Sequence, residues 1–131
     1  MPYRILIADD IDPVRLAIRI GLERYGYTVC GEAVDGIDAL KKAVELRPDL
    51  IVLDLKMPKM NGVEAATILR RRFPAIPVVL VTLYDVGSSI ASAAGINAVV
   101  LKPDGMSNLH EHIKRLLEPP TPISTFIASE A

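Results

Sequence analysis

Five short apolar runs, separated by longer amphipathic segments, constrain the fold of this chain more than any other feature. Val, Ile and Leu dominate the runs without a strict polar alternation, as is typical of parallel strands covered on both faces. The runs are Tyr3–Ala8, Thr28–Gly31, Leu50–Leu53, Pro77–Val81 and Ala98–Leu101. Five β-α units in series, joined by right-handed crossovers, predict a doubly wound α/β fold around a parallel sheet.

Helix start and stop signals lie between the runs. Asp12 can cap a first helix, because Pro13 would occupy its first position and Gly26 follows where it should end. We expect a second helix over Asp35–Leu46 and a third over Val63–Arg72, each followed by a proline that cannot continue it.

The C-terminal part of the chain is less regular. Segment 86–94 contains one Gly and three Ser and has the weakest helix propensity, which indicates either neutral drift or an element that moves. Ser107 can cap a last helix that reaches Leu117. Residues 119–131 contain three prolines and show no period, so we expect a disordered tail or the stub of a linker after a domain over residues 1–118.

Length and composition exclude several classes of protein. A chain of 131 residues is one ordinary domain, and none of its apolar runs approaches the roughly 18 residues that a membrane span needs. The chain enters its first apolar run with no signal peptide ahead of it, and the lone Cys30 cannot form an internal disulfide. We therefore expect a cytoplasmic protein with no membrane contact.

The charge argues against a surface that binds nucleic acid. The 15 basic and 16 acidic residues give a formal charge of −1, whereas binding to phosphates normally requires a basic excess. The single basic cluster, Arg70–Arg72, lies where it would complement the C-terminal end of a helix dipole. Direct binding to nucleic acid is not expected.

Ionisable or hydroxyl side chains follow four of the five runs. They are Asp9 and Asp10, Asp54, Thr82 and Lys102. The carboxyl ends of parallel strands meet at one edge of the sheet, where α/β folds place their ligands. Three carboxylates gathered there repel one another, so such a site raises a pKa, stays hydrated or binds a cation. An oxygen-only cluster suits Mg²⁺ better than zinc.

This combination of groups matches the needs of phosphoryl transfer. A divalent cation, the amine of Lys102 and the hydroxyl of Thr82 would neutralise and orient the oxygens of a moving phosphoryl group. Asp54, at the end of its strand, is the natural acceptor and would form an aspartyl phosphate.

The ordered set of motifs resembles the receiver domain of two-component response regulators, the CheY-like family. The matching residues are Asp9-Asp10, Asp54 in LDLKMP, Gly62, Thr82 after VVLV, and Lys102-Pro103 after AVVL. Each motif is common by itself, but the set, in this order and spacing over residues 3–117, is specific. The resemblance implies a flavodoxin-like (βα)5 fold with strand order 2-1-3-4-5.

The resemblance also implies a role for each acidic residue. Asp54 would accept a phosphoryl group from a sensor histidine kinase or a histidine phosphotransfer protein. Asp10 would bind Mg²⁺ directly, Asp9 would bind it through water, and the backbone carbonyl of Lys56 would supply a further ligand. Asp54 would complete this metal site.

A second group of residues would carry the signal away from the site. By resemblance, Thr82 would move towards the phosphoryl group, Lys102 would pair with it, and Pro103 would fix the loop through a cis bond. Receivers commonly carry Tyr or Phe three residues before the lysine, whereas this chain has Val99. Tyr84, two residues after Thr82, either gates the site instead or is a residue of a solvent-edge loop.

These inferences predict a single-domain receiver that is not an enzyme beyond its own phosphoryl transfer and slow autodephosphorylation. Phosphorylation would switch a face for a downstream protein, formed by helix 86–94, strand 98–101 and helix 107–117. Two alternatives stay open. One is the receiver fragment of a DNA-binding transcriptional regulator, and the other is a degenerate receiver that acts as a scaffold.

Overall fold

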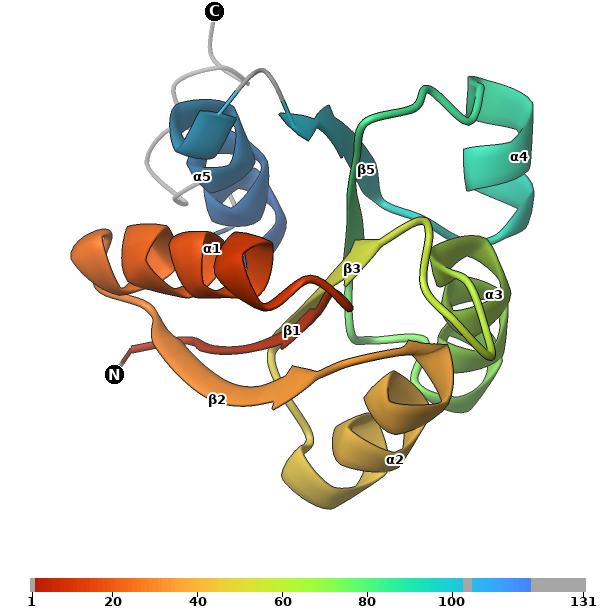
Figure 1. The fold of residues 1–131 in the computed structure, drawn as a ribbon, viewed down its shortest axis with the longest axis horizontal. Helices are drawn as coiled ribbons and strands as arrows, with labels where there is room; N and C mark the ends of the chain where they lie inside the picture. The colour runs from red at the N-terminus through yellow and green to blue at the C-terminus, as the bar shows by residue number, and fades with distance from the viewer. Residues whose placement is uncertain (1, 103–104, 119–131) are drawn as a thin grey trace, which may run out of the picture.

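The fold is a five-stranded parallel sheet with helices on both faces (Figure 1). The computed structural model describes residues 2–102 and 105–118. The strands are β1 (Arg4–Ala8), β2 (Thr28–Ala33), β3 (Leu50–Asp54), β4 (Val78–Thr82) and β5 (Ala98–Leu101). Their order is β2-β1-β3-β4-β5, which confirms the predicted flavodoxin-like topology.

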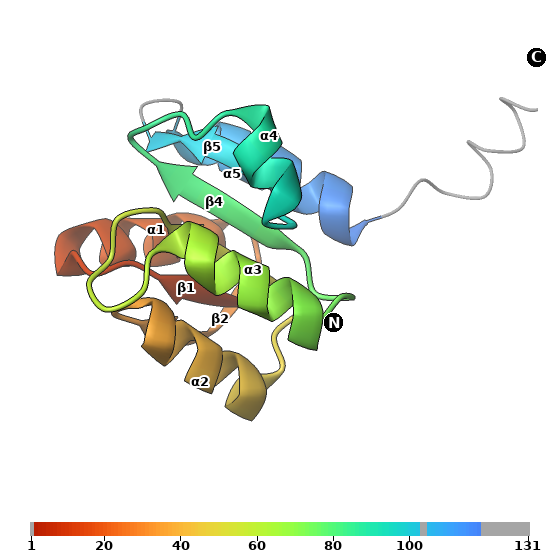
Figure 2. The same cartoon turned by 90° about the vertical axis from the view of Figure 1, so that its right-hand side faces the viewer.

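Two layers of helices enclose the sheet (Figures 1 and 2). The helices are α1 (Asp12–Arg24), α2 (Gly36–Leu46), α3 (Gly62–Arg72), α4 (Ser88–Ala93) and α5 (Gly105–Leu117). α1 and α5 cover one face, and α2, α3 and α4 cover the other. None of the helices within the described ranges is long and apolar enough to cross a membrane.

The two faces of the sheet have separate apolar cores. Leu6 on β1 and Leu53 on β3 belong to the core under α2 and α3, whereas Ile7 and Val52 belong to the core under α1 and α5. Successive side chains of one strand therefore enter different cores. This burial on both faces explains why the apolar runs show no polar alternation.

The predicted boundaries of α2 and α3 are each correct to within one residue, since α2 begins at Gly36 and not at Asp35. The Asp35 side chain caps α2 by accepting the Asp38 N–H at 2.7 Å. α3 begins at Gly62, one residue before the predicted start, behind a capping box that Asn61 forms with Glu64. Both caps satisfy backbone N–H groups that the helix itself leaves unpaired.

Two predicted caps are wrong. Ile11, not Asp12, precedes the first residue of α1, and its side chain makes no capping hydrogen bond. Asp12 is already helical and pairs with Arg15, one turn further along. Ser107 lies inside α5, because that helix begins at Gly105.

The weakest predicted helix is also the shortest of the five. α4 has six residues, and Gly87 ahead of it adopts a φ of 81° and offers no side-chain cap. A helix this short owes its stability to packing against the rest of the fold.

Candidate functional site

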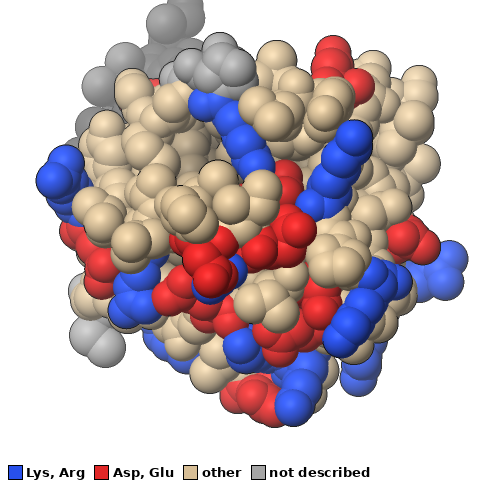
Figure 3. All heavy atoms as spheres, viewed as in Figure 1, with Lys and Arg blue, Asp and Glu red and all other residues tan. Residues whose placement is uncertain are grey.

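The predicted site residues meet at the carboxyl edge of the sheet. Asp54 is the last residue of β3, and Thr82 is the last residue of β4. Asp9 follows β1 directly, and Lys102 follows β5. Since β1, β3, β4 and β5 are neighbours in the sheet, their ends bring these four side chains to one place. Figure 3 shows acidic atoms gathered near the middle of this face, with basic side chains beside them.

Asp9, Asp10 and Asp54 form a compact acidic cluster. One carboxylate oxygen from each lies within 4.8 Å of the other two. Asp9 and Asp54 are buried, whereas Asp10 is exposed on the open side of the cluster. The cluster contains only oxygen ligands, so its chemistry fits a hard divalent cation such as Mg²⁺.

Backbone amides hold the two buried carboxylates in place. The Ile11 N–H donates to Asp9 Oδ1, and the Leu55 N–H donates to Asp54 Oδ1, both at 2.9 Å. Each side chain therefore has a fixed orientation before any ligand binds.

Lys102 places a positive charge against the buried acids. Its Nζ lies 3.2 Å from Asp54 Oδ1 and 3.4 Å from Asp9 Oδ2. The pKa of Asp54 is nevertheless raised above its ordinary value, because burial and the repulsion from Asp9 outweigh Lys102 and the Leu55 N–H. Burial is the largest of these causes.

Thr82 turns its hydroxyl towards its own loop. The side chain is buried, and its Oγ1 accepts the Tyr84 N–H at 3.1 Å. Thr82 and Asp54 share a cavity of about 200 Å³. The cavity is lined by Asp10, Ile11, Asp54, Lys56, Thr82, Leu83, Tyr84 and Lys102.

Lys56 and Tyr84 approach each other at this cavity. The Nζ of Lys56 lies 4.2 Å from the centroid of the Tyr84 ring, a cation–π contact between the loops that follow β3 and β4. Both side chains are exposed, and Tyr84 is 50% accessible. Sequence reasoning assigned Lys56 only a backbone role and missed this contact.

Gly62 allows α3 to start directly against the end of β3. A Cβ at this position would lie 2.2 Å from the backbone oxygen of Asp54 and 2.8 Å from a methyl of Leu80. The Gly62 N–H instead donates to the Leu55 carbonyl at 2.9 Å. Any side chain here would displace the segment that carries Asp54.

Val99 is half-buried on β5 and faces a shallow hollow beside α4. This hollow has a volume of about 530 Å³. It is lined by Asp85, Gly87, Ser88, Ala91, Ser92, Ile96, Asn97, Ala98 and Val99. The prediction for Pro103 concerns a residue outside the described ranges.

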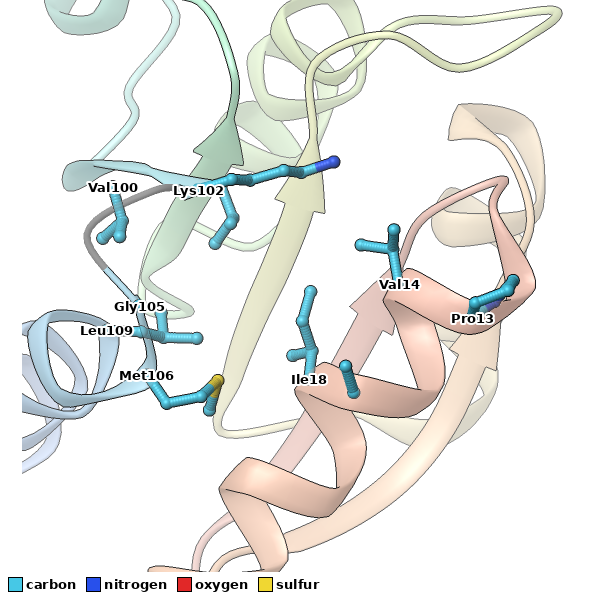
Figure 4. A pocket seen from close by; sticks show the side chains of 10 residues that line it. Pro13, Val14, Ile18, Val100, Lys102, Gly105, Met106 and Leu109 are labelled. Atoms are coloured by element: carbon cyan, nitrogen blue, oxygen red, sulfur yellow. The ribbon is translucent and has the colours of Figure 1, made fainter.

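An apolar cavity of about 400 Å³ lies behind Lys102, between α1 and α5 (Figure 4). Val14 and Ile18 on α1 face Met106 and Leu109 on α5 across it, and Lys102 is the one charged residue in its lining. The cavity therefore offers no second ligand set. Lys102 borders the cavity, and its amine lies 3.2 Å from Asp54 Oδ1.

Arg15 is a neighbour of the site that sequence reasoning missed. Its guanidinium contacts the Asp9 carbonyl and the carboxylates of Asp12 and Glu32. Only the pair with Asp12, three residues away on one helix, is visible in the sequence as a local pattern. The other two contacts depend on the packing of α1 against the edge of the sheet.

The fold and the site are those of a response regulator receiver domain, a signalling module. Residues 5–114 match the model of the response regulator receiver domain, so the chain belongs to this family of two-component signalling proteins. Receiver domains in general bind Mg²⁺ at an acidic pocket and work with histidine kinases or phosphotransfer proteins.

The chain is similar to several characterised relatives. It is 37% identical over 118 residues to the response regulator protein VraR of Staphylococcus saprophyticus. The match covers 88% of this chain and 56% of VraR. The chain thus spans little more than half the length of this relative.

The chain is also similar to solved structures of response regulators. A DNA-binding response regulator of the LuxR family from Staphylococcus aureus superposes with a TM-score of 0.83 at 27% identity, covering 88% of this chain and 99% of that one. The response regulator TrrA from Thermotoga maritima, solved in complex with Mg²⁺-BeF, has a TM-score of 0.82 at 32% identity, covering 89% and 100%.

Proposed function

We propose that this protein accepts a phosphoryl group on Asp54, in a reaction that depends on Mg²⁺. The observation that carries the proposal is the position of Asp54. Its carboxylate lies within 4.8 Å of those of Asp9 and Asp10 and 3.2 Å from the amine of Lys102. An acceptor between a cation site and a fixed positive charge is what phosphoryl transfer requires.

The acidic cluster would hold the cation. By the resemblance to receiver domains, Asp10, which is exposed, would bind it directly, and Asp9, which is buried against Lys102, would act through water. Asp54 and the backbone carbonyl of Lys56 would complete the ligand set. The bound Mg²⁺ would neutralise the oxygens of the incoming phosphoryl group. The TrrA structure with Mg²⁺-BeF supports this assignment by analogy.

Asp54 would attack the phosphorus of a phosphohistidine on a sensor kinase or a phosphotransfer protein. The Oδ1 of Asp54 already contacts Lys102 and the Leu55 N–H, so we expect the new bond to form at Oδ2. The bond from phosphorus to the donor imidazole breaks, and the imidazole keeps the electron pair. Lys102 then pairs with an oxygen of the transferred group.

Thr82 would transmit the change to the next loop. An aspartyl phosphate adds about two negative charges beside Lys102. The Thr82 hydroxyl now accepts a hydrogen bond from the Tyr84 N–H at 3.1 Å. If the hydroxyl turned to donate to a phosphoryl oxygen, it would lose this hydrogen bond. Loss of that contact frees the loop between β4 and the short helix α4.

The downstream partner would bind the face made by segments 86–94, 98–101 and 107–117. Val99 is too small to report the switch through a large rotamer change, and the hollow beside it leaves α4 room to shift. The low helix propensity of α4 would keep alternative arrangements of this helix close in free energy, so a modest interaction changes their populations. We propose that this face contacts neither nucleic acid nor a membrane directly.

We propose a stand-alone receiver over residues 1–118 with a tail over 119–131, working in the cytoplasm. The lone Cys30 thiol, whose pKa is raised by burial, suits a reducing compartment. The chain covers 56% of VraR and resembles a DNA-binding LuxR-family regulator, which favours a receiver fragment of a transcription factor as the second candidate. The mass of the natural gene product distinguishes the two. The complete acidic cluster with Thr82 and Lys102 argues against a degenerate scaffold.

Labelling by a small phosphodonor tests the acceptor. Acetyl phosphate with Mg²⁺ should add one acid-stable, base-labile phosphoryl group, observed as one mass increment. Asp54→Ala should remove the increment, and Asp85→Ala, outside the acidic cluster, should keep it. Labelling of Asp54→Ala at the wild-type level would refute the assignment.

A further inference from the structure

We propose that Arg15 is a positioning residue for the cation site, because it fixes the peptide unit that orients Asp10. This inference rests on the proposed function, and it assigns a role to a residue on α1 that lies outside the ligand set. Arg15 would touch neither the cation nor the phosphoryl group. It would act through the backbone of Asp9.

All three nitrogens of the Arg15 guanidinium are engaged. Nη1 donates to the Asp9 carbonyl at 2.8 Å, Nε donates to Glu32 Oε1 at 2.8 Å, and Nη2 donates to Asp12 Oδ1 at 2.7 Å. The side chain is 13% exposed. A planar fork with three occupied directions cannot rotate without losing a charge-assisted hydrogen bond.

The carbonyl that Arg15 holds belongs to the peptide bond between Asp9 and Asp10. The other groups of Asp9 are also held, since its N–H donates to the Ala33 carbonyl at 3.0 Å and its Oδ1 accepts the Ile11 N–H. Because the peptide unit is planar, its carbonyl direction sets the direction in which the chain leaves towards Asp10. Arg15 therefore fixes the backbone position from which the exposed Asp10 side chain extends towards the cluster.

Glu32 on β2 anchors Arg15 from the other side. Its second carboxylate oxygen accepts Arg19 Nη1 at 2.5 Å, and its backbone carbonyl accepts the Lys42 amine. Burial would raise the pKa of Glu32, but Arg19 and Arg15 outweigh burial and lower it, so Glu32 stays charged near neutral pH. The anchor connects the acidic cluster to β2, two positions away from β3 in the sheet.

Electrostatics and positioning predict opposite effects of removing Arg15. A positive charge near three carboxylates repels a cation, so its loss should by Coulomb's law alone tighten Mg²⁺ binding. If Arg15 orients Asp10, its loss should weaken binding, as the loss of outer partners of metal ligands typically does by roughly 10- to 100-fold. Whether Mg²⁺ binding becomes tighter or weaker after the loss of Arg15 therefore distinguishes the electrostatic effect from the positioning effect.

The Kd for Mg²⁺ is measured by calorimetric titration of the metal-free protein with MgCl₂. The measurement is repeated with Mn²⁺ by electron paramagnetic resonance. Arg15→Gln should raise the Kd by about tenfold or more. Arg15→Lys keeps the charge but cannot form the fork, so it should also weaken binding. Arg19→Gln is the matched control, since Arg19 shares Glu32 but does not contact Asp9, and its Kd should stay equal or fall.

Further measurements exclude a general loss of structure. Thermal melts in EDTA should show folded variants. In acetyl phosphate assays, Arg15→Gln should need more Mg²⁺ for half the maximal rate yet approach the wild-type rate at saturation. A Kd of Arg15→Gln or Arg15→Lys at or below the wild-type value would overturn the inference. A wild type that binds no Mg²⁺ would overturn the proposed function itself, and this role with it.

Discussion

The amine of Lys102 lies 3.2 Å from Asp54 Oδ1, although the two residues are 48 positions apart in the chain. β4 lies between the strands that precede the two residues, so their ion pair spans the width of β4. This ion pair links the β3 and β5 ends of the sheet over Thr82, the last residue of β4. A change of charge at Asp54 therefore acts directly on Lys102 and affects the adjacent ends of β3, β4 and β5.

Mg²⁺ should stabilise the fold. A cation that binds only the native state at ten times its Kd contributes about 1.4 kcal/mol, which amounts to several degrees in Tm. Asp10→Ala should erase this increment and raise the stability of the metal-free protein, because one of three crowded charges is lost. Melts with EDTA and with millimolar Mg²⁺ measure both effects. Asp85→Ala should retain the increment, and a wild type without one would contradict the cation site.

The raised pKa of Asp54 should make metal-free stability depend on pH. The folded state holds the Asp54 proton more tightly than the unfolded chain, so this group's contribution is present at low pH. It is lost as the pH rises from about 3.8 through the folded pKa. Asp54→Asn removes the contribution and should gain stability relative to wild type as the pH increases. Urea unfolding of both proteins in EDTA between pH 4 and pH 7 tests this expectation. A stability advantage of Asp54→Asn that shrinks as the pH rises would contradict it.

Thr82→Ala should lower the stability by about 1 kcal/mol, because the partly buried Tyr84 N–H loses its acceptor. Thr82→Ser keeps a hydroxyl and should lose less. In hydrogen exchange with beryllofluoride, the wild type should change over residues 82–95 and 102–110, and Thr82→Ala should suppress these changes. Exchange that changes only beside Asp54 would indicate a phosphate carrier without a switch.

Tyr84 and Lys56 should slow the loss of the phosphoryl group. Their cation–π contact spans the two loops at the cavity, so Tyr84→Ala should admit water more freely and shorten the lifetime of the aspartyl phosphate severalfold. Tyr84→Phe keeps the ring face and should preserve the lifetime. Decay of the phosphorylated species followed by intact mass measures this. Equal lifetimes for all three proteins would mean that Tyr84 is a loop residue without a gating role.

Gly62→Ala should destabilise the protein by roughly 2–4 kcal/mol and reduce phosphorylation, because the new Cβ would collide with the Asp54 backbone. Gly87→Ala is the matched control. No atom lies within 4 Å of a Cβ there, and its cost of about 1 kcal/mol comes from the φ of 81° alone. Urea unfolding and acetyl phosphate labelling of both variants compare the two. Similar effects on labelling would mean that Gly62 has no special relation to Asp54.

The arrangement of strands and the meeting of the acidic residues were determined by the sequence. Continuous apolar runs bury both faces of a strand, and the residue after each run then lies at the carboxyl edge of the sheet. For this reason Asp9, Asp54, Thr82 and Lys102 could be placed together from their positions in the chain alone. Local capping rules were less reliable, because α1 begins at Asp12 and α5 begins at Gly105, so the expected caps Asp12 and Ser107 lie inside their helices.

The groups that hold the site in place come from elements that are distant in the chain and meet only after packing. Arg15 reaches Asp9 and Glu32 because α1 packs across the ends of β1 and β2, and Lys56 reaches Tyr84 because two separate loops approach each other at the cavity. The raised pKa of Asp54 likewise arises from burial and from Asp9, neither of which is fixed until the sheet forms. Local periodicity specifies each element by itself, whereas these contacts depend on how close separate elements come after packing.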